Sequence, residues 1–296
     1  MPPSLRAIPG VVGVGFGLKE CAGTVTDVLA WRVYVGEKRP LDRVRPEELV
    51  PASAHGRPTD VVEKIATRSA SGVTLAPASP GARIANSLGI PGTLGCLAVT
   101  LHDRRAVLLT NHHVLFGGGA PEDAPVWLVD GPQGAPSFRE LGRSLYGKRG
   151  IVAFGGVDHH VDCAVASADL AGRRRRRWRR RRKLSVGVAA PDDRVTKTGG
   201  ATGTTAGIVV DIAYPDVAVL DGRTQHAPQQ ILVHPDGDGP FSAEGDSGAI
   251  LRTERGTAVG LLWGVNHRGE SVCCHIGPVL EVLNIGALTG TTRVGG

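Results

Sequence analysis

The sequence has few aromatic residues and no long apolar run. Phe, Trp and Tyr make up 4% of the 296 residues, and no stretch of eighteen consecutive apolar residues occurs. A membrane-spanning helix requires such a stretch, so the sequence excludes one. The first ten residues, MPPSLRAIPG, also lack the basic segment and apolar stretch of a secretory signal. These absences predict a cytoplasmic protein that does not contact a membrane.

The five cysteines do not form the pattern of a disulfide framework. Their number is odd, Cys21 and Cys96 are isolated, and Cys273 and Cys274 are neighbours. Small domains that are stabilised by disulfides carry an even number of cysteines at regular spacing. We therefore expect all five thiols, including that of Cys163 in an apolar segment, to be reduced.

Two clusters of His, Asp and Cys residues are candidates for a metal site. The first is segment 158–162 (DHHVD), and the second is segment 273–275 (CCH). Adjacent residues of a strand point to opposite faces, so neither cluster presents its side chains to one ion. The sequence thus predicts no metal and no organic cofactor. It places His159 and His160 in a turn before the strand that carries Asp162.

Most of the excess positive charge lies in one segment. The chain has 34 basic and 28 acidic residues, and ten of the basic ones fall between Arg173 and Lys183. Without them 24 basic residues remain, so the general surface is mildly acidic. Arginines around Trp178 suit phosphate contact and base stacking. A like-charged block also repels itself, and its place between two groups of strands favours a solvated insertion over a nucleic-acid site.

Glycine and proline are abundant, with 42 and 20 residues, and they separate short apolar segments. The patterns predict strands at 11–17 and 28–35 that form a hairpin or adjacent strands, a short helix within 43–50 and a strand at 59–64. These elements define a small α/β domain over residues 1–66, followed by a linker over residues 67–90. Its Gly-x-Gly-x-Gly stretch lacks the helix that follows a nucleotide-binding loop, so we interpret it as strand or bulge.

From residue 91 to residue 296, short strand patterns recur at regular intervals. They occur at 95–101, 106–110, 126–129 and 161–167, then at 194–196, 207–212, 217–220, 230–234, 249–251 and 258–263. Regular strand spacing without helical periods predicts mainly β structure in two barrels or sandwiches. We place barrel one at about 91–170 and barrel two at about 184–276, and the apolar spacing of 278–285 predicts a C-terminal helix.

The tetrapeptide GDSG at 245–248 is the most informative motif for chemistry. Glycines on both sides of Ser247 permit a backbone tight enough to aim successive N–H groups at one point, which an oxyanion requires. Asp246 can hold this loop through an internal contact. The same residue types also form ordinary turns, so the motif alone does not establish a catalytic site.

Two further segments supply a base and an acid. An apolar strand pattern ends just before His112 and His113, and a His at a strand end is held by the scaffold yet reaches into a cleft. Asp162 is embedded in the apolar segment VDCAV, where a carboxylate requires a donor such as His. The order is His113, Asp162, Ser247, with 49 residues from the His to the Asp and 85 from the Asp to the Ser, and it is that of chymotrypsin-type triads.

Longer motifs make the chain resemble the trypsin-like (chymotrypsin-fold) serine proteases. It is similar over nearly its whole length to the NARROW LEAF 1-like subgroup of plants and bacteria, which has a short domain before the protease. The motifs are VVGVGFGLKE, WRVYVGEKRPL and GRPTDVVE in that domain, then GTLGCL, TNHHVLF, DCAVA, VTKTGGATGTTAGIV, FSAEGDSGAIL, AVGLLWG and PVLEVLNI. The chain departs from the subgroup at Gly200, where an Arg is usual, and in the arginine-rich insertion at 173–183.

The resemblance implies a chymotrypsin-like double antiparallel β-barrel and a serine endopeptidase that cleaves peptide bonds through an acyl-enzyme. It implies that His113, which directly precedes a Val in the subgroup's pattern, is the base rather than His112. Asp162 then matches the triad acid and Ser247 the nucleophile. The N–H groups of Gly245 and Ser247 would form the oxyanion hole.

The resemblance also places a pocket for the substrate side chain that precedes the cleaved bond (P1). In this fold the residue six positions before the nucleophile lies at the base of that pocket. This position is Phe241, which is followed by Ser242, and the opposite wall includes Trp263 and Gly264. None of these residues is charged, so we expect a small or medium apolar P1 residue rather than Arg or Lys.

Two alternative functions remain open. One is a protease fold without activity that binds protein partners, and the other is nucleic-acid binding through the arginine-rich segment. A complete triad argues against the first, because a scaffold has no need of a buried Asp that faces a His. We expect a protein or peptide as the partner. The sequence leaves the natural substrate and homo-oligomer formation open.

Overall fold

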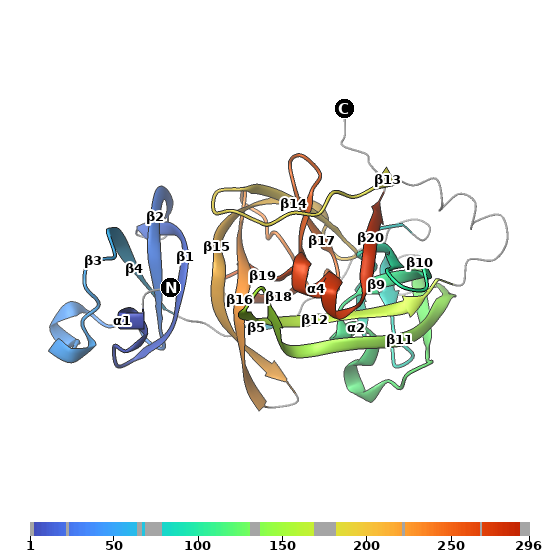
Figure 1. Ribbon diagram of the computed structural model, residues 1–296, viewed down its shortest axis with the longest axis horizontal. Helices are drawn as coiled ribbons and strands as arrows, with labels where there is room; N and C mark the ends of the chain where they lie inside the picture. Colours follow the sequence, from blue (N-terminus) through green and yellow to red (C-terminus); the bar gives the residue numbers. More distant parts are fainter. Residues whose placement is uncertain are drawn as a thin grey trace.

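The computed structural model describes residues 3–21, 24–63, 67–68, 79–130, 137–168, 182–220, 223–266 and 268–290. Within these residues the chain is mainly β, with two large sheets and three short α-helices (Figure 1). One sheet contains a closed barrel and the other curls beside it, so the expected chymotrypsin-like double β-barrel is confirmed. None of the described helices is long and apolar enough to cross a membrane.

The strands around the GDSG loop close into a six-stranded barrel, which is barrel two. They are β14 (Arg194–Gly199), β15 (Gly203–Leu220), β16 (Arg223–Pro235), β17 (Ile250–Thr253), β18 (Ala258–Asn266) and β19 (Ser271–His275). The ring closes because β14 pairs with both β17 and β15. Its interior is an apolar cluster that includes Val195, Val209, Phe241 and Leu251. The GDSG loop lies between β16 and β17.

The second sheet forms barrel one. Its strands are β6 (Arg83–Ala85), β7 (Pro91–Thr93), β8 (Cys96–Thr100), β9 (Ala106–Thr110), β10 (Pro125–Asp130), β11 (Ser137–Phe154), β12 (Val157–Ser167), β13 (Arg182–Lys183) and β20 (Ile285–Gly290). Helix α2 (His112–Phe116) and the short 3₁₀-helix η3 (Gly117–Gly119) follow β9. Antiparallel pairing of β9 with β12 brings the histidines at the end of β9 toward Asp162.

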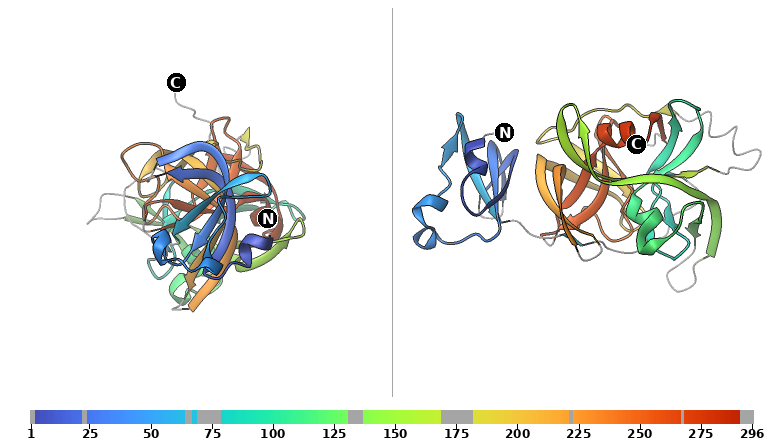
Figure 2. Two further views of the ribbon diagram at one scale, coloured as in Figure 1. Left: turned by 90° about the vertical axis from the view of Figure 1, so that its left-hand side faces the viewer. Right: turned by 60° about the horizontal axis from the view of Figure 1, so that its bottom comes forward.

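The two barrels lie side by side (Figure 2) and share one core cluster. Cys96 and Val161 from barrel one and Leu261 from barrel two belong to it. The predicted C-terminal helix is α4 (Ile276–Val282), and it is followed by β20, which pairs with β8 of barrel one. This strand was not predicted, because the helical spacing of apolar residues continues in the sequence to residue 285.

The N-terminal module lies at one end of the molecule, beside β15 (Figure 1). It contains α1 (Pro3–Arg6), β1 (Val11–Cys21), β2 (Thr24–Val35), β3 (Ser53–Ala54) and β4 (Arg57–Glu63). The predicted hairpin of β1 and β2 is confirmed. The helix expected within 43–50 is instead two 3₁₀ turns, η1 (Leu41–Arg43) and η2 (Pro46–Glu48). Prolines near this segment interrupt a longer helix because they lack the N–H donor.

Alternate glycines in β1 permit a close approach of the module to β15. A Cβ atom at Gly17 would lie 1.7 Å from the carbonyl oxygen of Val210, and one at Gly15 would lie 2.1 Å from Asp211 Oδ2. Asp211 accepts hydrogen bonds from the Phe16 N–H, at 3.2 Å, and from the Tyr34 hydroxyl. The Gly-x-Gly-x-Gly stretch is therefore a strand, as interpreted, and its glycines serve packing against barrel two.

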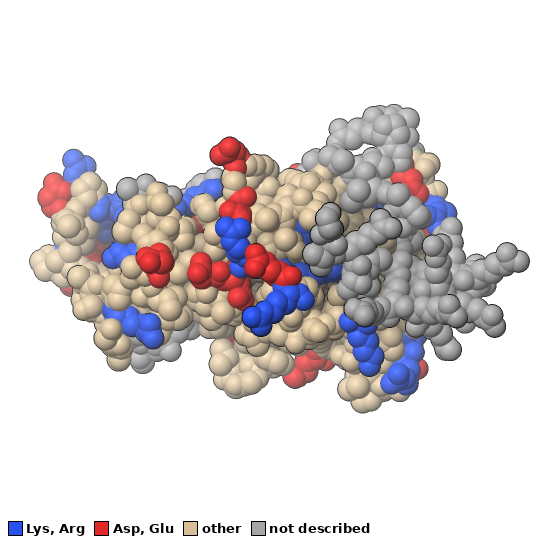
Figure 3. All heavy atoms as spheres, turned by 90° about the horizontal axis from the view of Figure 1, so that it is seen from above, with Lys and Arg blue, Asp and Glu red and all other residues tan. Residues whose placement is uncertain are grey.

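Two segments singled out in the sequence lie mostly outside the described residues. Of the expected linker, 69–78 is not described, while β5 (Thr67–Arg68) pairs with Val265 and Asn266 of β18. Of the arginine-rich segment, 173–181 is not described, and its last two residues form β13, which pairs with β20. The end of that insertion is thus part of a sheet. On the face shown in Figure 3, acidic and basic side chains intermingle.

Candidate active site

His113 and Asp162 lie in direct contact. The His113 Nδ1 atom is 2.9 Å from Asp162 Oδ2, and the His113 backbone N–H donates to Asp162 Oδ1 at 3.1 Å. Asn111, at the start of α2, donates from Nδ2 to the Asp162 carbonyl oxygen at 2.6 Å. The neighbouring His112 instead packs its ring against Phe116, with ring centroids 4.9 Å apart. Of the two histidines, His113 is the one that Asp162 orients.

The Asp162 carboxylate is fully buried and has two positively charged or chargeable neighbours. Burial acts to raise the pKa of Asp162, but His113 and the Arg149 guanidinium outweigh it and hold the pKa well below its usual range. Arg149 lies opposite Asp162 in the β11–β12 pairing, and its Nε is 3.0 Å from Oδ2. Asp162 is therefore ionised at neutral pH, as an acid that orients an imidazole must be.

The GDSG loop is held by a buried ion pair that the sequence analysis missed. Lys197 Nζ of β14 is 3.1 Å from Asp246 Oδ2, and both side chains are fully buried. Burial lowers the pKa of Lys197, and the Asp246 charge opposes this shift. Strand alternation gave a signal, because Lys197 occupies the same inward face of β14 as the core residue Val195.

Backbone donors complete the environment of Asp246. Its Oδ1 accepts the N–H groups of Ala201, at 2.8 Å, and Thr202, at 3.1 Å. Its Oδ2 accepts the Ala243 N–H at 3.0 Å and the Thr202 hydroxyl at 2.7 Å. The internal contact expected for Asp246 is thus present, and it extends to the turn between β14 and β15. The loop around Ser247 is consequently fixed to the barrel-two scaffold on several sides.

The same loop packs against the strand end that leads to His113. The Ser247 carbonyl accepts the Thr93 N–H at 2.7 Å, and the Thr110 hydroxyl donates to the Thr93 carbonyl at 2.8 Å. A Cβ atom at Gly248 would lie 2.3 Å from Thr110 Oγ1, so only glycine fits there. Gly248 also has φ +100°, which favours glycine. Thr110 is the last residue of β9, two positions before α2.

Gly200 supports this junction although it departs from the subgroup's pattern. Its N–H donates to Thr93 Oγ1 at 2.8 Å. A Cβ atom there would lie 3.0 Å from the Arg83 Cα, which is backbone and does not yield easily. A larger residue at position 200 would therefore require a shift of the chain near Arg83. In this protein the position is adapted to glycine.

In the part of the chain that the structure describes, the Ser247 hydroxyl is hydrogen-bonded to barrel two and not to His113. Ser247 Oγ contacts the Trp263 carbonyl oxygen at 3.4 Å. Among the described residues, none accepts a hydrogen bond from the Gly245 or Ser247 N–H. The intervening Asp246 N–H donates to Ala243 O, and the Gly248 N–H donates to Leu262 O. The two donors expected to bind an oxyanion are thus the two that the loop leaves free within the described structure.

The residues predicted to line a substrate pocket all belong to barrel two. Phe241 is fully buried in the barrel core, and its ring centroid is 5.8 Å from Lys197 Nζ. The Ser242 hydroxyl is 2.6 Å from the Ser271 hydroxyl. Trp263 donates from Nε1 to Gln230 Oε1 at 2.8 Å, and Gly264 follows it in β18. The assignment of these residues to a pocket stays a prediction.

His159 and His160 lie within β12, not in a turn before the Asp162 strand, so that expectation was wrong. The strand begins at Val157 because β11 and β12 pair as far as Phe154 and Val157. Burial lowers the pKa of His160 to about 4, so its imidazole is neutral at neutral pH. Among the described residues, no group of three or more His, Cys, Asp or Glu side chains could hold a metal ion.

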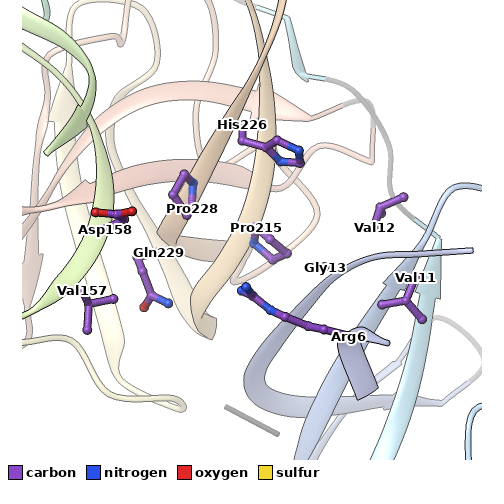
Figure 4. Close-up of a pocket in the computed structure, with 10 residues that line it drawn as sticks. All are labelled: Arg6, Val11, Val12, Gly13, Val157, Asp158, Pro215, His226, Pro228 and Gln229. Atoms are coloured by element: carbon purple, nitrogen blue, oxygen red, sulfur yellow. The ribbon is translucent and has the colours of Figure 1, made fainter. Parts of the chain in front are cut away.

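A cavity of about 470 Å³ lies between the N-terminal module and the barrels (Figure 4). Arg6 and Val11 line it from the module, Pro215 and His226 from β15 and β16, and Asp158 from β12. Its lining includes none of the residues His113, Asp162 and Ser247. The cavity is therefore separate from the candidate active site.

Comparisons with known proteins find similarity among solved structures. No family model and no curated protein matches the chain. NAPase, a Nocardiopsis protease, is 16% identical with a TM-score of 0.46, and the match covers 72% of this chain and 100% of that one. A glutamic acid-specific serine protease that uses a histidine triad in substrate binding is 12% identical, with a TM-score of 0.48 and the same coverage.

A third similar structure is Thermobifida fusca Protease A. It is 15% identical with a TM-score of 0.41, and the match covers 73% of this chain and 100% of that one. All three neighbours are proteases by name, and the second is named as a serine protease. This chain itself is a chymotrypsin-like double β-barrel.

Proposed function

We propose that the protein is a serine endopeptidase in which Ser247, His113 and Asp162 form a catalytic triad. The observation that carries the proposal is the 2.9 Å contact of His113 Nδ1 with the buried Asp162 carboxylate, next to the fixed GDSG loop. A buried carboxylate that orients an imidazole supports this proposal, because an imidazole held in this way activates a hydroxyl nucleophile that comes within reach of its other ring nitrogen. The membership of the NARROW LEAF 1-like subgroup is part of the proposal and is supported by the sequence motifs alone.

In the proposed reaction Ser247 Oγ leaves the weak contact with Trp263 O and attacks the carbonyl carbon of the peptide bond. The hydroxyl proton passes to Nε2 of His113, whose Nδ1–H is held by Asp162. The C–N bond then breaks as His113 returns the proton to the leaving amine, which yields an acyl-enzyme. Water hydrolyses the ester by the same proton transfers in reverse order.

The N–H groups of Gly245 and Ser247 would bind the negative oxygen of the tetrahedral intermediate. Donors that need no reorganisation during the reaction stabilise such an oxygen, and losing one costs about 10²–10³ in rate. The Lys197–Asp246 pair supports this role because it fixes the backbone between the two donors. No step requires a metal or an organic cofactor.

A small or medium apolar P1 residue is the substrate preference that we propose. Ser242, Trp263 and Gly264 offer no carboxylate to pair with Arg or Lys, and a buried cation without a partner is costly. The nearby Glu270 is engaged by Asn266 Nδ2 at 2.8 Å. A peptide library scan measures the preference, and a strong preference for Arg or Lys at P1 would overturn this part of the proposal.

Labelling with a fluorophosphonate probe tests the nucleophile. The wild-type protein should be labelled at Ser247 and hydrolyse peptides, whereas Ser247→Ala and His113→Ala should each lose roughly 10⁶-fold in kcat, with the double variant no worse. A labelled Ser247 distinguishes the peptidase from a protease fold without activity. An unlabelled, correctly folded wild-type protein without peptide hydrolysis would reject the proposed function.

A further inference from the structure

Arg149 contacts the same carboxylate oxygen as His113. It lies on β11 directly opposite Asp162 of β12, so the backbone register brings the two side chains together. The Arg149 Nε atom is 3.0 Å from Asp162 Oδ2, which is also the oxygen 2.9 Å from His113 Nδ1. The Asp162 side chain is fully buried, while that of Arg149 is 24% exposed. The guanidinium thus forms an ion pair with the carboxylate oxygen that His113 contacts, although the Arg149 Nε–H makes no hydrogen bond to it.

The other titratable groups around Asp162 are neutral near pH 7. They are His112 on α2, His160 on β12, Cys163 on β12 and Cys274 on β19. Burial lowers the pKa of both histidines and raises the pKa of both thiols, so each stays uncharged. Among these neighbours, Asp162 and Arg149 carry the fixed charges, and these are opposite in sign.

We propose that Arg149 is a positioning residue of this site, which holds the Asp162 carboxylate in place and sets the pH above which His113 accepts the Ser247 proton. The inference rests on the proposed function of Ser247, His113 and Asp162. Arg149 itself does not touch the substrate or the reacting atoms. It acts through the carboxylate that it shares with His113.

The physical reason is the balance of charge at the imidazole. The Asp162 carboxylate favours the protonated form of His113, and the Arg149 charge offsets part of that attraction. Without Arg149, the full carboxylate charge would act on His113, and the imidazole would keep its proton to a higher pH. A protonated His113 is no base, so the acid limb of the activity profile would move to higher pH. A purely structural role would lower kcat without moving this limb.

Kinetics with Arg149→Gln, Arg149→Lys and the matched control Lys148→Gln test the proposal. Lys148 is the neighbouring cation on β11, but its side chain is exposed. For Arg149→Gln the midpoint of the acid limb of kcat/KM should rise by about one pH unit, with a lower plateau of kcat and little change in KM. Arg149→Lys should fall between Arg149→Gln and the wild type, and Lys148→Gln should match the wild type.

A measurement without catalysis separates this inference from the proposed function. In a Ser247→Ala background, NMR of labelled histidines follows the titration of His113, which is assigned by its loss in His113→Gln. Arg149→Gln should raise this midpoint by about one pH unit. If the midpoint rises but the wild-type protein hydrolyses no peptide, the proposed function fails and the charge coupling stands.

Three results would overturn the role of Arg149. They are an unchanged midpoint in Arg149→Gln, a lower midpoint, or an equal rise in Lys148→Gln. If Arg149→Gln does not fold, Arg149→Lys tests the direction of the shift instead. The shorter lysine side chain weakens the contact with Asp162, so the titration midpoint of His113 must still lie above that of the wild type. Thermal unfolding of each variant shows which of them are folded.

Discussion

Each barrel buries one carboxylate beside the candidate site, but the two have different partners. Asp162 of barrel one contacts a histidine that can gain or lose a proton and an arginine that is partly exposed. Asp246 of barrel two contacts a fully buried lysine, the Thr202 hydroxyl and three backbone N–H groups. In the proposed mechanism Asp162 stabilises His113 when the imidazole takes up a proton. Asp246 instead keeps the GDSG loop in one conformation.

Among the substitutions that compare the two carboxylates, Asp162→Asn should have the largest effect, and this effect is on kcat. The amide keeps the shape but no longer selects the correct His113 tautomer, so kcat should fall by roughly 10⁴ with the fold intact. Steady-state kinetics measures the loss, and circular dichroism checks the fold. A fall below about tenfold would mean that Asp162 does not orient the base.

The substitution Lys197→Met should mainly lower the free energy of unfolding. It leaves the buried Asp246 carboxylate without its cation, and breaking such a pair costs about 3–5 kcal/mol of unfolding free energy. Urea unfolding measures the change, with Lys148→Met as the control because that lysine is exposed. A change below about 1 kcal/mol would mean that the three backbone donors and the Thr202 hydroxyl satisfy Asp246 without the cation.

When the pH is lowered from 6 to 2, the free energy of unfolding should fall by about 2 kcal/mol more for the wild type than for Asp162→Asn. The pKa of Asp162 is lower in the folded protein than in the unfolded chain, so its ionised form stabilises the fold fully above about pH 4. That contribution is lost progressively as the pH falls further, toward the folded pKa. Urea unfolding between pH 6 and pH 2 should therefore show a steeper loss for the wild type, and parallel curves would contradict this sign.

The smallest effect is expected for His112→Ala. Its ring packs on Phe116 and not on Asp162, so kcat should change by less than about threefold. The same assay on His113→Ala serves as the comparison. Inactivation by His112→Ala with a harmless His113→Ala would reverse the assignment of the base.

The pattern of the sequence predicted the strands and the motif residues, but not their partners. Strand alternation and turn residues are local, and they indicated the β1–β2 hairpin, the strand of Asp162 and the loop of Ser247. Alternation places Lys197 on the inward face of its strand, but nothing near Lys197 or Arg149 in the sequence identifies the carboxylates that they contact. Their partners lie 49 and 13 residues away along the chain, and only sheet pairing brings them together.

The sequence by itself determined the mainly β character, the order His, Asp, Ser and the glycine alternation of β1, because period and turn chemistry are properties of neighbouring residues. The tertiary structure decided that His113 rather than His112 meets Asp162 and that Lys197 and Arg149 neutralise the two buried carboxylates. It also decided that the C-terminal segment returns to barrel one as β20. These outcomes depend on which distant segments become buried together, since a charge or a strand edge finds its partner only when the barrels close.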